Sequence, residues 1–345
     1  MEIREAVRKG HFIMNSMRLS SLRVAVCGYL AISGIPVSAN DEFLGRWALT
    51  IPGDRAGWME ITRHDGWYDG SILWGGGSVV PLASVYFDDG LLHVTRVREV
   101  KRETDGKPGR VQHFTETIIA KLDGDELEFQ HINPQNNGRS VDRASFTGKR
   151  VPPLPPRPDL DEVEFGDPIK LFNGKDITGW RLTDSDRKNG WKMLDGNLVN
   201  RPEGRRGYGN LRTEAEFEDF NLTLETNVPP GGNSGVYLRG IYEIQVVDSY
   251  GQPPSVQSMG SLYSRIQPTT NPSKPPGEWQ TLDITLVDRH LTVVLNGETV
   301  IDNQPVAGCT GGALWSDETR PGPIFLQGDH GPADFRNLVL RPVRR

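Results

Sequence analysis

The sequence predicts an all-β protein made of antiparallel sheets. Turn dipeptides recur along the chain, among them Asp65-Gly66, Asp123-Gly124 and Asn296-Gly297. Short runs of alternating apolar and polar residues lie between these turns, and no long amphipathic helix pattern interrupts them. Regularly spaced short strands joined by Gly, Asn and Asp turns are typical of antiparallel sandwiches and barrels.

Residues 1–39 are predicted to be an export signal. Five basic residues lead into an apolar run at 24–37, which ends in the small-residue cleavage pattern Val37-Ser38-Ala39. No other stretch approaches the roughly 20 apolar residues of a membrane helix. We therefore expect an exported protein, periplasmic or secreted, that has no membrane span and whose mature chain starts at Asn40.

Charge and cysteine content exclude several classes of protein. The predicted signal holds five basic and two acidic residues, so its removal changes the net charge from −6 to −9. A surface this acidic repels nucleic acid, and we expect no nucleic-acid partner. Cys27 leaves with the signal and Cys309 stays alone, which rules out an intramolecular disulfide in the mature chain.

Residues 40–150 are predicted to form a small antiparallel β-barrel or meander. Its opening Gly45-Arg46-Trp47 is similar to the Gly-x-Trp start of lipocalin-like barrels. Alternation and turn signals predict strands at Trp47–Ile51, Gly57–Thr62, Gly70–Trp74, Leu91–Val100, Val111–Lys121, Glu126–His131 and Ala144–Thr147. Gly75-Gly76-Gly77 lies between strands with no helix pattern or Lys after it, so we do not interpret it as a phosphate-binding loop.

A Pro-rich linker is predicted to separate this domain from a larger one. Residues 151–158 contain five prolines, which hold an extended, semi-rigid conformation and cannot lie inside a sheet. We place the linker at 151–167 and the second domain at 168–345. The clearest hairpin there joins Leu291–Leu295 to Glu298–Asp302, and Thr281–Val287 is a strand before it.

The segment Asn233–Ser249 predicts two adjacent strands with a polar face. Val236 and Leu238 alternate with Tyr237 and Arg239, and Ile244 and Val246 alternate with Glu243 and Gln245. A three-residue loop at 240–242 would pair Arg239 with Glu243 and keep the apolar residues together. The resulting Tyr, Arg, Glu and Gln patch suits a polar ligand, although the residues alone favour an ion pair of Arg239 with Glu243 on a solvated face.

Several motifs of the second domain follow one another in the order of a known family. They are LFNGKDITGW (171–180), Trp191 with Asp195-Gly196, NSGVYLRG (233–240), YEIQVVDS (242–249), GSLY (260–263), PPGEWQ (275–280), LNG (295–297), LQGDHG (326–331) and FRNL (335–338). Residues 168–343 resemble the 3-keto-disaccharide hydrolase domain family, which implies a concanavalin-like jelly roll with a sugar-binding concave face. Two departures are Gly328, inserted before Asp329-His330, and Gln280, where Asn is usual.

The resemblance implies cleavage of glycosides already oxidised to a ketone at carbon 3. The ketone acidifies the hydrogen on carbon 2, so a base can remove it, the enolate can expel the aglycone, and water can then add. This route needs a base, an acid and groups that stabilise the enolate oxygen, rather than the paired carboxylates of ordinary glycosidases.

The family motifs place these roles on particular residues. Glu243 or His330 would be the base and the other the acid, and Arg239 would hold the ketone or enolate oxygen. A divalent metal ion could stabilise the enolate oxygen instead, although no residue spacing in the sequence defines a metal site. Residues expected to contact the sugar are Asn233, Tyr237, Gln245, Asp248, Trp279, Gln327 and Asp329.

Two alternative functions stay open at this stage. A carbohydrate-binding, lectin-like protein of the same fold would have little use for a Glu and a His in one pocket. The N-terminal barrel could instead bind an apolar or polymeric ligand while the second domain attaches to glycan. We expect neither alternative, but a 3-keto-glycoside hydrolase or lyase with an oligosaccharide or glycoside as its partner.

Overall fold

A computed structural model describes residues 39–104, 107–203 and 207–344. The predicted export signal lies almost entirely before these residues, and its structure is not described. The chain from Ser38 to Arg345 forms one compact unit. In the part of the chain that is described, no helix is long and apolar enough to cross a membrane.

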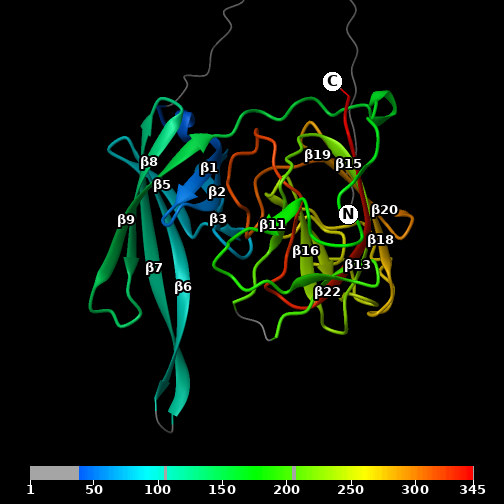
Figure 1. Cartoon of the computed structure of the whole chain (residues 1–345). Helices are drawn as coiled ribbons and strands as arrows, with labels where there is room; N and C mark the ends of the chain where they lie inside the picture. The colour runs from blue at the N-terminus through cyan, green and yellow to red at the C-terminus, as the bar shows by residue number, and fades with distance from the viewer. Residues whose placement is uncertain (1–38, 105–106, 204–206, 345) are drawn as a thin grey trace, which may run out of the picture. The chain divides into compact units, whose positions relative to one another are not determined.

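Nine strands of the described chain form the first sheet, in the order β4-β3-β2-β1-β9-β8-β7-β6-β5. Nearly every strand pairs with its neighbour in sequence, as expected for a meander, and Figure 1 shows β6 and β7 side by side as a long hairpin. The strands are β1 (Gly45–Ile51), β2 (Arg55–His64), β3 (Trp67–Trp74), β4 (Val80–Pro81), β5 (Ser84–Asp88), β6 (Leu91–Thr104), β7 (Lys107–Asp123), β8 (Glu126–Pro134) and β9 (Val141–Arg150).

The two edges of this sheet meet at the link between β4 and β5. The Leu82 amide donates to the Gly70 carbonyl of β3, and the Ala83 amide donates to the Thr95 carbonyl of β6. These bonds close the sheet around a core that includes Trp47 and Met59. The prediction of an antiparallel β-barrel or meander is confirmed, and each of the seven predicted strands lies inside an observed one.

Two further antiparallel sheets follow. The larger contains β10 (Ile169–Lys170), β12 (Trp191–Leu194), β13 (Asn197–Asn200), β15 (Phe220–Asn227), β18 (Gln280–Val287), β19 (His290–Leu295), β20 (Glu298–Pro305) and β22 (Ala333–Pro342). The smaller contains β11 (Trp180–Leu182), β14 (Leu211–Thr213), β16 (Asn233–Leu238), β17 (Tyr242–Val247) and β21 (Phe325–Leu326).

These two sheets bury their apolar faces against each other. Leu222 and Ile284 of the larger sheet belong to the same core cluster as Val236 and Ile244 of the smaller sheet. Alternate residues of β15 are buried, as a sheet with one face on a core requires. The result is the jelly-roll β-sandwich that the sequence predicts. Its predicted hairpin is also present, with Asn296 and Gly297 both at positive φ in the turn.

The first sheet and the sandwich share part of a core. Trp58 of β2 is buried among the sandwich residues, and the Arg265 guanidinium lies 4.2 Å from the centre of its ring. The Pro-rich segment is also held, because Arg289 donates to the Pro152 carbonyl at 2.9 Å and Asn303 to the Pro158 carbonyl at 2.9 Å. The division into domains on either side of 151–167 stays a prediction.

Candidate active site

The β16–β17 hairpin brings the candidate residues together, in a register that differs from the predicted one. Tyr237 pairs with Glu243, and Leu238 pairs with Tyr242 around a loop whose first residue, Arg239, has a φ of 53°. The predicted pairing of Arg239 with Glu243 is therefore wrong by two residues. A shift of two leaves every side chain on its original face, so Tyr237 and Glu243 still share the polar face.

A glycine makes room for the Glu243 side chain on this face. Gly235 lies on β16, and a Cβ added there would lie 2.9 Å from Cγ and 3.0 Å from Cδ of Glu243. Such distances are too short for any real side chain, so the Glu243 carboxyl group occupies the space that only glycine leaves open. The Glu243 amide donates to the Thr310 hydroxyl at 2.9 Å, which fixes the backbone at the same point.

Glu243 lines a cavity of about 290 Å³, and the side chains around it all carry polar groups. Loops from several parts of the chain surround it. The lining residues are Gly76, Gly77, Asn210, Asn233, Tyr237, Glu243, Gln245, Tyr263, Gly311, Gly312, Gln327, Asp329 and His330.

Glu243 is 4% exposed, and its environment favours the protonated form of the carboxyl group. Burial raises its pKa to about 8, while the Tyr237 hydroxyl and the nearby His330 act in the opposite direction and Asp329 adds to the rise. A carboxyl group with a pKa near 8 can both accept and release a proton close to neutral pH. This is the property that general acid–base chemistry needs.

Tyr237 forms a rigid wall beside Glu243. Its ring stacks on Phe325 with the centroids 3.7 Å apart, and its hydroxyl donates to the Gly311 carbonyl at 2.7 Å. The Gln327 amide donates weakly to the same hydroxyl oxygen at 3.4 Å. Burial raises the pKa of Tyr237 well above its usual value, so the phenol keeps its proton and acts as a neutral wall.

Asp329 and His330 lie on the opposite loop as a bonded pair. The distance from His330 Nδ1 to Asp329 Oδ1 is 2.7 Å, and both side chains are about half exposed. Asn200 holds this loop by donating to the Gly328 and Gly331 carbonyls, each at 2.8 Å. The inserted Gly328 is thus built into the loop, and Asp329 and His330 line the same cavity as Glu243.

Two amide oxygens of the cavity are positioned to accept hydrogen bonds from a ligand. Gln245 Oε1 and Gln327 Oε1 are buried and have no hydrogen-bond partner among the described residues. Buried polar atoms are nearly always paired in functional states, so a hydroxyl-rich ligand would satisfy both. The Gln245 amide nitrogen lies 3.4 Å from Asn233 Oδ1, which orients the group.

Comparison with known proteins identifies this part of the chain. A family described as the 3-keto-alpha-glucoside-1,2-lyase-like domain matches residues 167–341, about half of the chain. The chain belongs to this family. The match confirms the resemblance and nearly the same limits that the sequence predicts.

One named protein and several solved structures are similar to parts of this chain. A 3-keto-disaccharide hydrolase of Bacteroides thetaiotaomicron is 29% identical over 166 residues, which cover 39% of this chain and 57% of the relative. The chain thus spans little more than half of that relative. Two proposed glycosyl hydrolases of Parabacteroides distasonis ATCC 8503 are also similar. The first is 28% identical, has a TM-score of 0.42, and matches over 56% of this chain and 94% of the hydrolase chain. The second is 23% identical, has a TM-score of 0.44, and matches over 51% of this chain and 94% of the hydrolase chain.

Arg239, which the family pattern suggests for the enolate oxygen, lies elsewhere. Its side chain is 2% exposed, and its guanidinium donates to the Glu318 carbonyl at 2.8 Å and to the Arg320 carbonyl at 2.6 and 3.1 Å. It does not line the Glu243 cavity. Its left-handed backbone turns the side chain off the polar face, and the guanidinium holds the 318–320 loop. The catalytic role of Arg239 stays a prediction.

Asp248 and Trp279 also lie outside the cavity. Asp248 accepts a hydrogen bond from the Gly231 amide at 2.9 Å and so supports a turn. The Trp279 ring stacks under the Arg336 guanidinium at 4.0 Å, and Arg336 in turn bonds to Glu225 on β15. Gln280, the other departure from the family pattern, is buried and bonds to the backbone of Lys274. Trp279 and Gln280 thus support the larger sheet, and Asp248 supports the turn before β16 of the smaller sheet.

The structure adds residues that sequence reasoning missed. Asn210 lines the cavity, and its Oδ1 accepts from the Gly328 amide at 2.7 Å. Tyr263 belongs to the GSLY motif, which signalled the family but no role for this side chain. The glycines at 76, 77, 311 and 312 were missed because a residue without a side chain carries no chemical signal.

The described residues contain no group of three or more His, Cys, Asp and Glu side chains that could hold a metal ion. Within the described cavity lining, His330 is the side chain that can carry a positive charge near neutral pH. Glu243, His330 and the neutral donors around them are the groups of this lining that can transfer protons or make polar contacts.

Proposed function

We propose that the protein cleaves 3-keto-glycosides by elimination followed by hydration. The observation that supports this most strongly is the buried Glu243 carboxyl group, which shares one small polar cavity with the His330–Asp329 pair. A base of this kind, beside a second proton carrier, matches what removal of the carbon-2 hydrogen requires. The family and the name of the Bacteroides relative point to the same substrate class.

Glu243 is the proposed base. Its carboxylate takes the proton from carbon 2, and the electrons of the broken C–H bond form the enolate with the carbon-3 oxygen. Because burial raises its pKa, the carboxylate is a stronger base than an ordinary glutamate. Neutral donors around the cavity, including the amides of Asn210 and Asn233, are the groups available to hold the enolate oxygen.

His330 is the proposed acid. The enolate re-forms the ketone and breaks the bond from carbon 1 to the glycosidic oxygen, which takes a proton from the imidazolium. His330 is half exposed, whereas Glu243 is buried, so His330 suits the side where the aglycone leaves. Asp329 accepts a hydrogen bond from Nδ1, which orients the ring.

Water completes the cycle by adding to the enone. Its oxygen bonds to carbon 1, one of its protons returns to His330, and Glu243 gives its proton back to carbon 2. The products are the free 3-keto sugar and the aglycone, and both side chains end in their starting states. The net reaction is hydrolysis without an oxidant or reductant.

The function is tested by aglycone release from a chromogenic 3-keto-glucoside, measured beside its unoxidised parent. We expect release from the keto compound alone, because only the ketone acidifies the carbon-2 hydrogen. Addition of EDTA should leave the rate unchanged. Exchange of the carbon-2 hydrogen with deuterated water, followed by mass spectrometry, reports proton abstraction directly.

Two outcomes would contradict the proposal. Equal release from both compounds would indicate an ordinary glycosidase mechanism. Binding of the sugar without release or exchange would support the lectin-like alternative.

A further inference from the structure

We propose that residues 75–77 of the first sheet, here called the glycine loop, form one wall of the active site and limit it to a single sugar unit at a chain end. This inference rests on the proposed function, because it names the form of the substrate for that site. The loop follows β3, far in sequence from the hairpin that carries Glu243, and belongs to the part of the chain that the family does not cover.

Direct contacts place the glycine loop at the cavity. Gly76 and Gly77 line the same space as Glu243 and His330. The two residues that follow fix the loop to the sandwich: Ser78 Oγ lies 3.3 Å from the Tyr263 hydroxyl, and the Val79 amide donates to Ser264 Oγ at 2.9 Å. The loop is therefore held by hydrogen bonds at one end and is not a free surface segment.

Backbone packing fixes the other side of the wall. A Cβ added at Gly311 would lie 2.7 Å from the Gly77 amide nitrogen, so the two backbones touch where neither residue has a side chain. The carbonyl of the same Gly311 accepts the hydrogen bond from Tyr237. The glycine loop thus presses against the segment that positions Tyr237, which is the neighbour of Glu243 in the site.

The size of the cavity indicates what the wall does. Its volume of about 290 Å³ lies at the lower limit of ligand pockets, which are roughly 300–1,000 Å³. An open sheet face would accept an internal unit of a long chain, whereas a walled pocket of this size holds one sugar ring. The keto sugar must therefore enter as a terminal unit, with its aglycone toward the mouth.

Gly76 is the position of the glycine loop where a side chain can be added at the cavity lining without disturbing the fold. Gly75 and Gly77 have φ values of 76° and 90°, where a side chain is strained, but Gly76 does not, and a Cβ there would meet no atom within 4 Å. We therefore choose Gly76→Leu, with Gly76→Ala as the milder change. Gly109, an exposed glycine on β7 whose Cβ would meet only the Arg102 carbonyl at 3.5 Å, gives the matched control Gly109→Leu.

The kinetic test compares a 3-keto-disaccharide with methyl 3-keto-glucoside. For Gly76→Leu we expect kcat/KM to fall at least tenfold on both substrates, because both place the same keto-sugar ring against the wall, and Gly76→Ala should lie between Gly76→Leu and the parent. Gly109→Leu should match the parent on both. Equal values for Gly76→Leu and Gly109→Leu would overturn the inference, as would faster cleavage within a long keto-polysaccharide than at its end.

A second measurement does not depend on activity. A water-soluble carbodiimide modifies protonated carboxyl groups, and the modification of Glu243 is followed at pH 6 by peptide mass spectrometry. A leucine in the wall should slow this modification at least threefold relative to Gly109→Leu. If the parent protein cleaves no keto-glycoside, the proposed function fails while this rate still tests the wall; an unchanged rate overturns the wall even if the enzyme is active.

Discussion

The structure contains two cavities that each hold a buried glutamate, and their difference shows which features mark a site. The larger, about 450 Å³, includes Glu318, and the smaller, about 290 Å³, includes Glu243. Burial raises the pKa of both carboxyl groups. Volume and a shifted pKa are thus common to both cavities, and neither property separates them.

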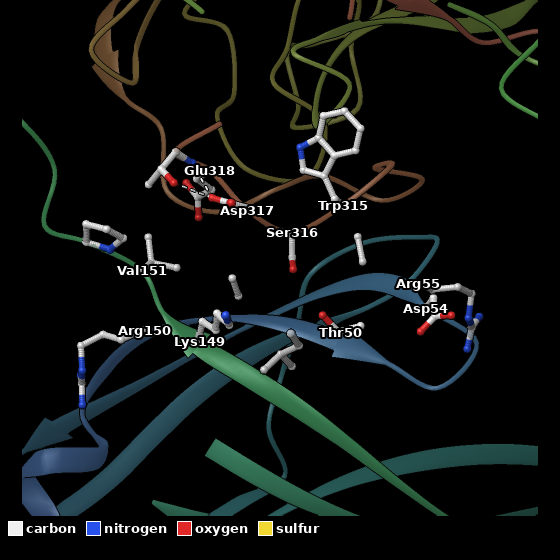
Figure 2. Close-up of a pocket in the computed structure, with 15 residues that line it drawn as sticks. Thr50, Asp54, Arg55, Lys149, Arg150, Val151, Trp315, Ser316, Asp317 and Glu318 are labelled. Carbon is white, nitrogen blue, oxygen red and sulfur yellow. Dashed lines mark hydrogen bonds between the residues drawn. The ribbon is translucent and has the colours of Figure 1, made fainter. Parts of the chain in front are cut away.

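The neighbours of the two glutamates do separate them. Glu318 Oε2 accepts from the Tyr242 hydroxyl at 3.1 Å and from the Gly308 amide at 3.0 Å, both within the interior. Figure 2 shows Glu318 and Trp315 on one side of the larger cavity and Thr50 and Lys149 across it. Glu243 instead shares its cavity with the imidazole of His330 and with the side-chain amides of Gln245 and Gln327. Convergence of reactive groups, rather than size, marks the site.

The strongest test of this comparison replaces each glutamate by glutamine. Glu243→Gln should lower kcat/KM on a 3-keto-glucoside about 1,000-fold, because a general base contributes roughly 10²–10⁴-fold. Glu318→Gln keeps an acceptor for Tyr242 and should change kcat/KM less than threefold. Steady-state assays measure kcat/KM of both variants, and circular dichroism verifies that they fold. Comparable losses of kcat/KM in the two variants would mean that both glutamates serve one site.

A smaller loss should follow from crowding Glu243 without removing it. In Gly235→Ala the new Cβ would overlap the side chain of Glu243 and displace its carboxyl group. A displacement near 1 Å can cost about 100-fold in rate, so we expect kcat/KM to fall about 10- to 100-fold. Gly109→Ala is the control for an exposed strand glycine. Parent-like kinetics in Gly235→Ala would show that the carboxyl position is not critical.

The pH dependence should differ between the parent protein and Glu243→Gln. Glu243 acts as a base only when deprotonated, so below its pKa of about 8, at pH values where His330 stays protonated as the acid, kcat/KM should rise about tenfold per pH unit. A raised folded-state pKa stabilises the fold below the unfolded pKa of roughly 4.5, and this stability is lost as pH rises through about 8. Thermal melts at pH 5 and pH 9 should therefore differ less in Glu243→Gln than in the parent. If melting depends on pH in the same way in the parent and in Glu243→Gln, the raised pKa does not belong to Glu243.

The smallest effect on activity is expected at Arg239. Arg239→Lys removes hydrogen bonds to the Glu318 and Arg320 carbonyls and should lower the free energy of unfolding by about 1–3 kcal/mol. Because the guanidinium does not line the Glu243 cavity, kcat/KM of the folded variant should change less than threefold. Denaturant titration gives the first quantity and steady-state kinetics the second. A 100-fold loss in kcat/KM would show that Arg239 takes part in the reaction.

Local sequence signals predicted the strands well because they act over a few residues. The Asn296-Gly297 turn requires positive φ, and the apolar alternation of Thr281–Val287 requires one buried face. The β16–β17 register was missed by two residues for a physical reason. A shift of two keeps each side chain on its face, so hydrophobic alternation favours both registers equally, and the conformation of Arg239 decides between them.

The short range of sequence signals also explains which site residues could be predicted. Tyr237, Glu243 and Gln245 lie on one face of the β16–β17 hairpin and could be grouped from sequence. The family pattern added Asp329 and His330. Asn210 and the glycine loop reach the cavity through tertiary packing alone. No periodicity or spacing relates residue 76 to residue 243, and family knowledge could not supply the relation either, because the family match begins at residue 167.

Trp58 has a consequence for how the whole unit loses its structure. It lies on β2, yet its ring is buried in the core of the sandwich and stacked against Arg265, and the Cys309 thiol lies beside the Gly57 carbonyl. Melting the first sheet would open that shared core to water. The barrel and the sandwich should therefore unfold together, in one cooperative calorimetric transition rather than two.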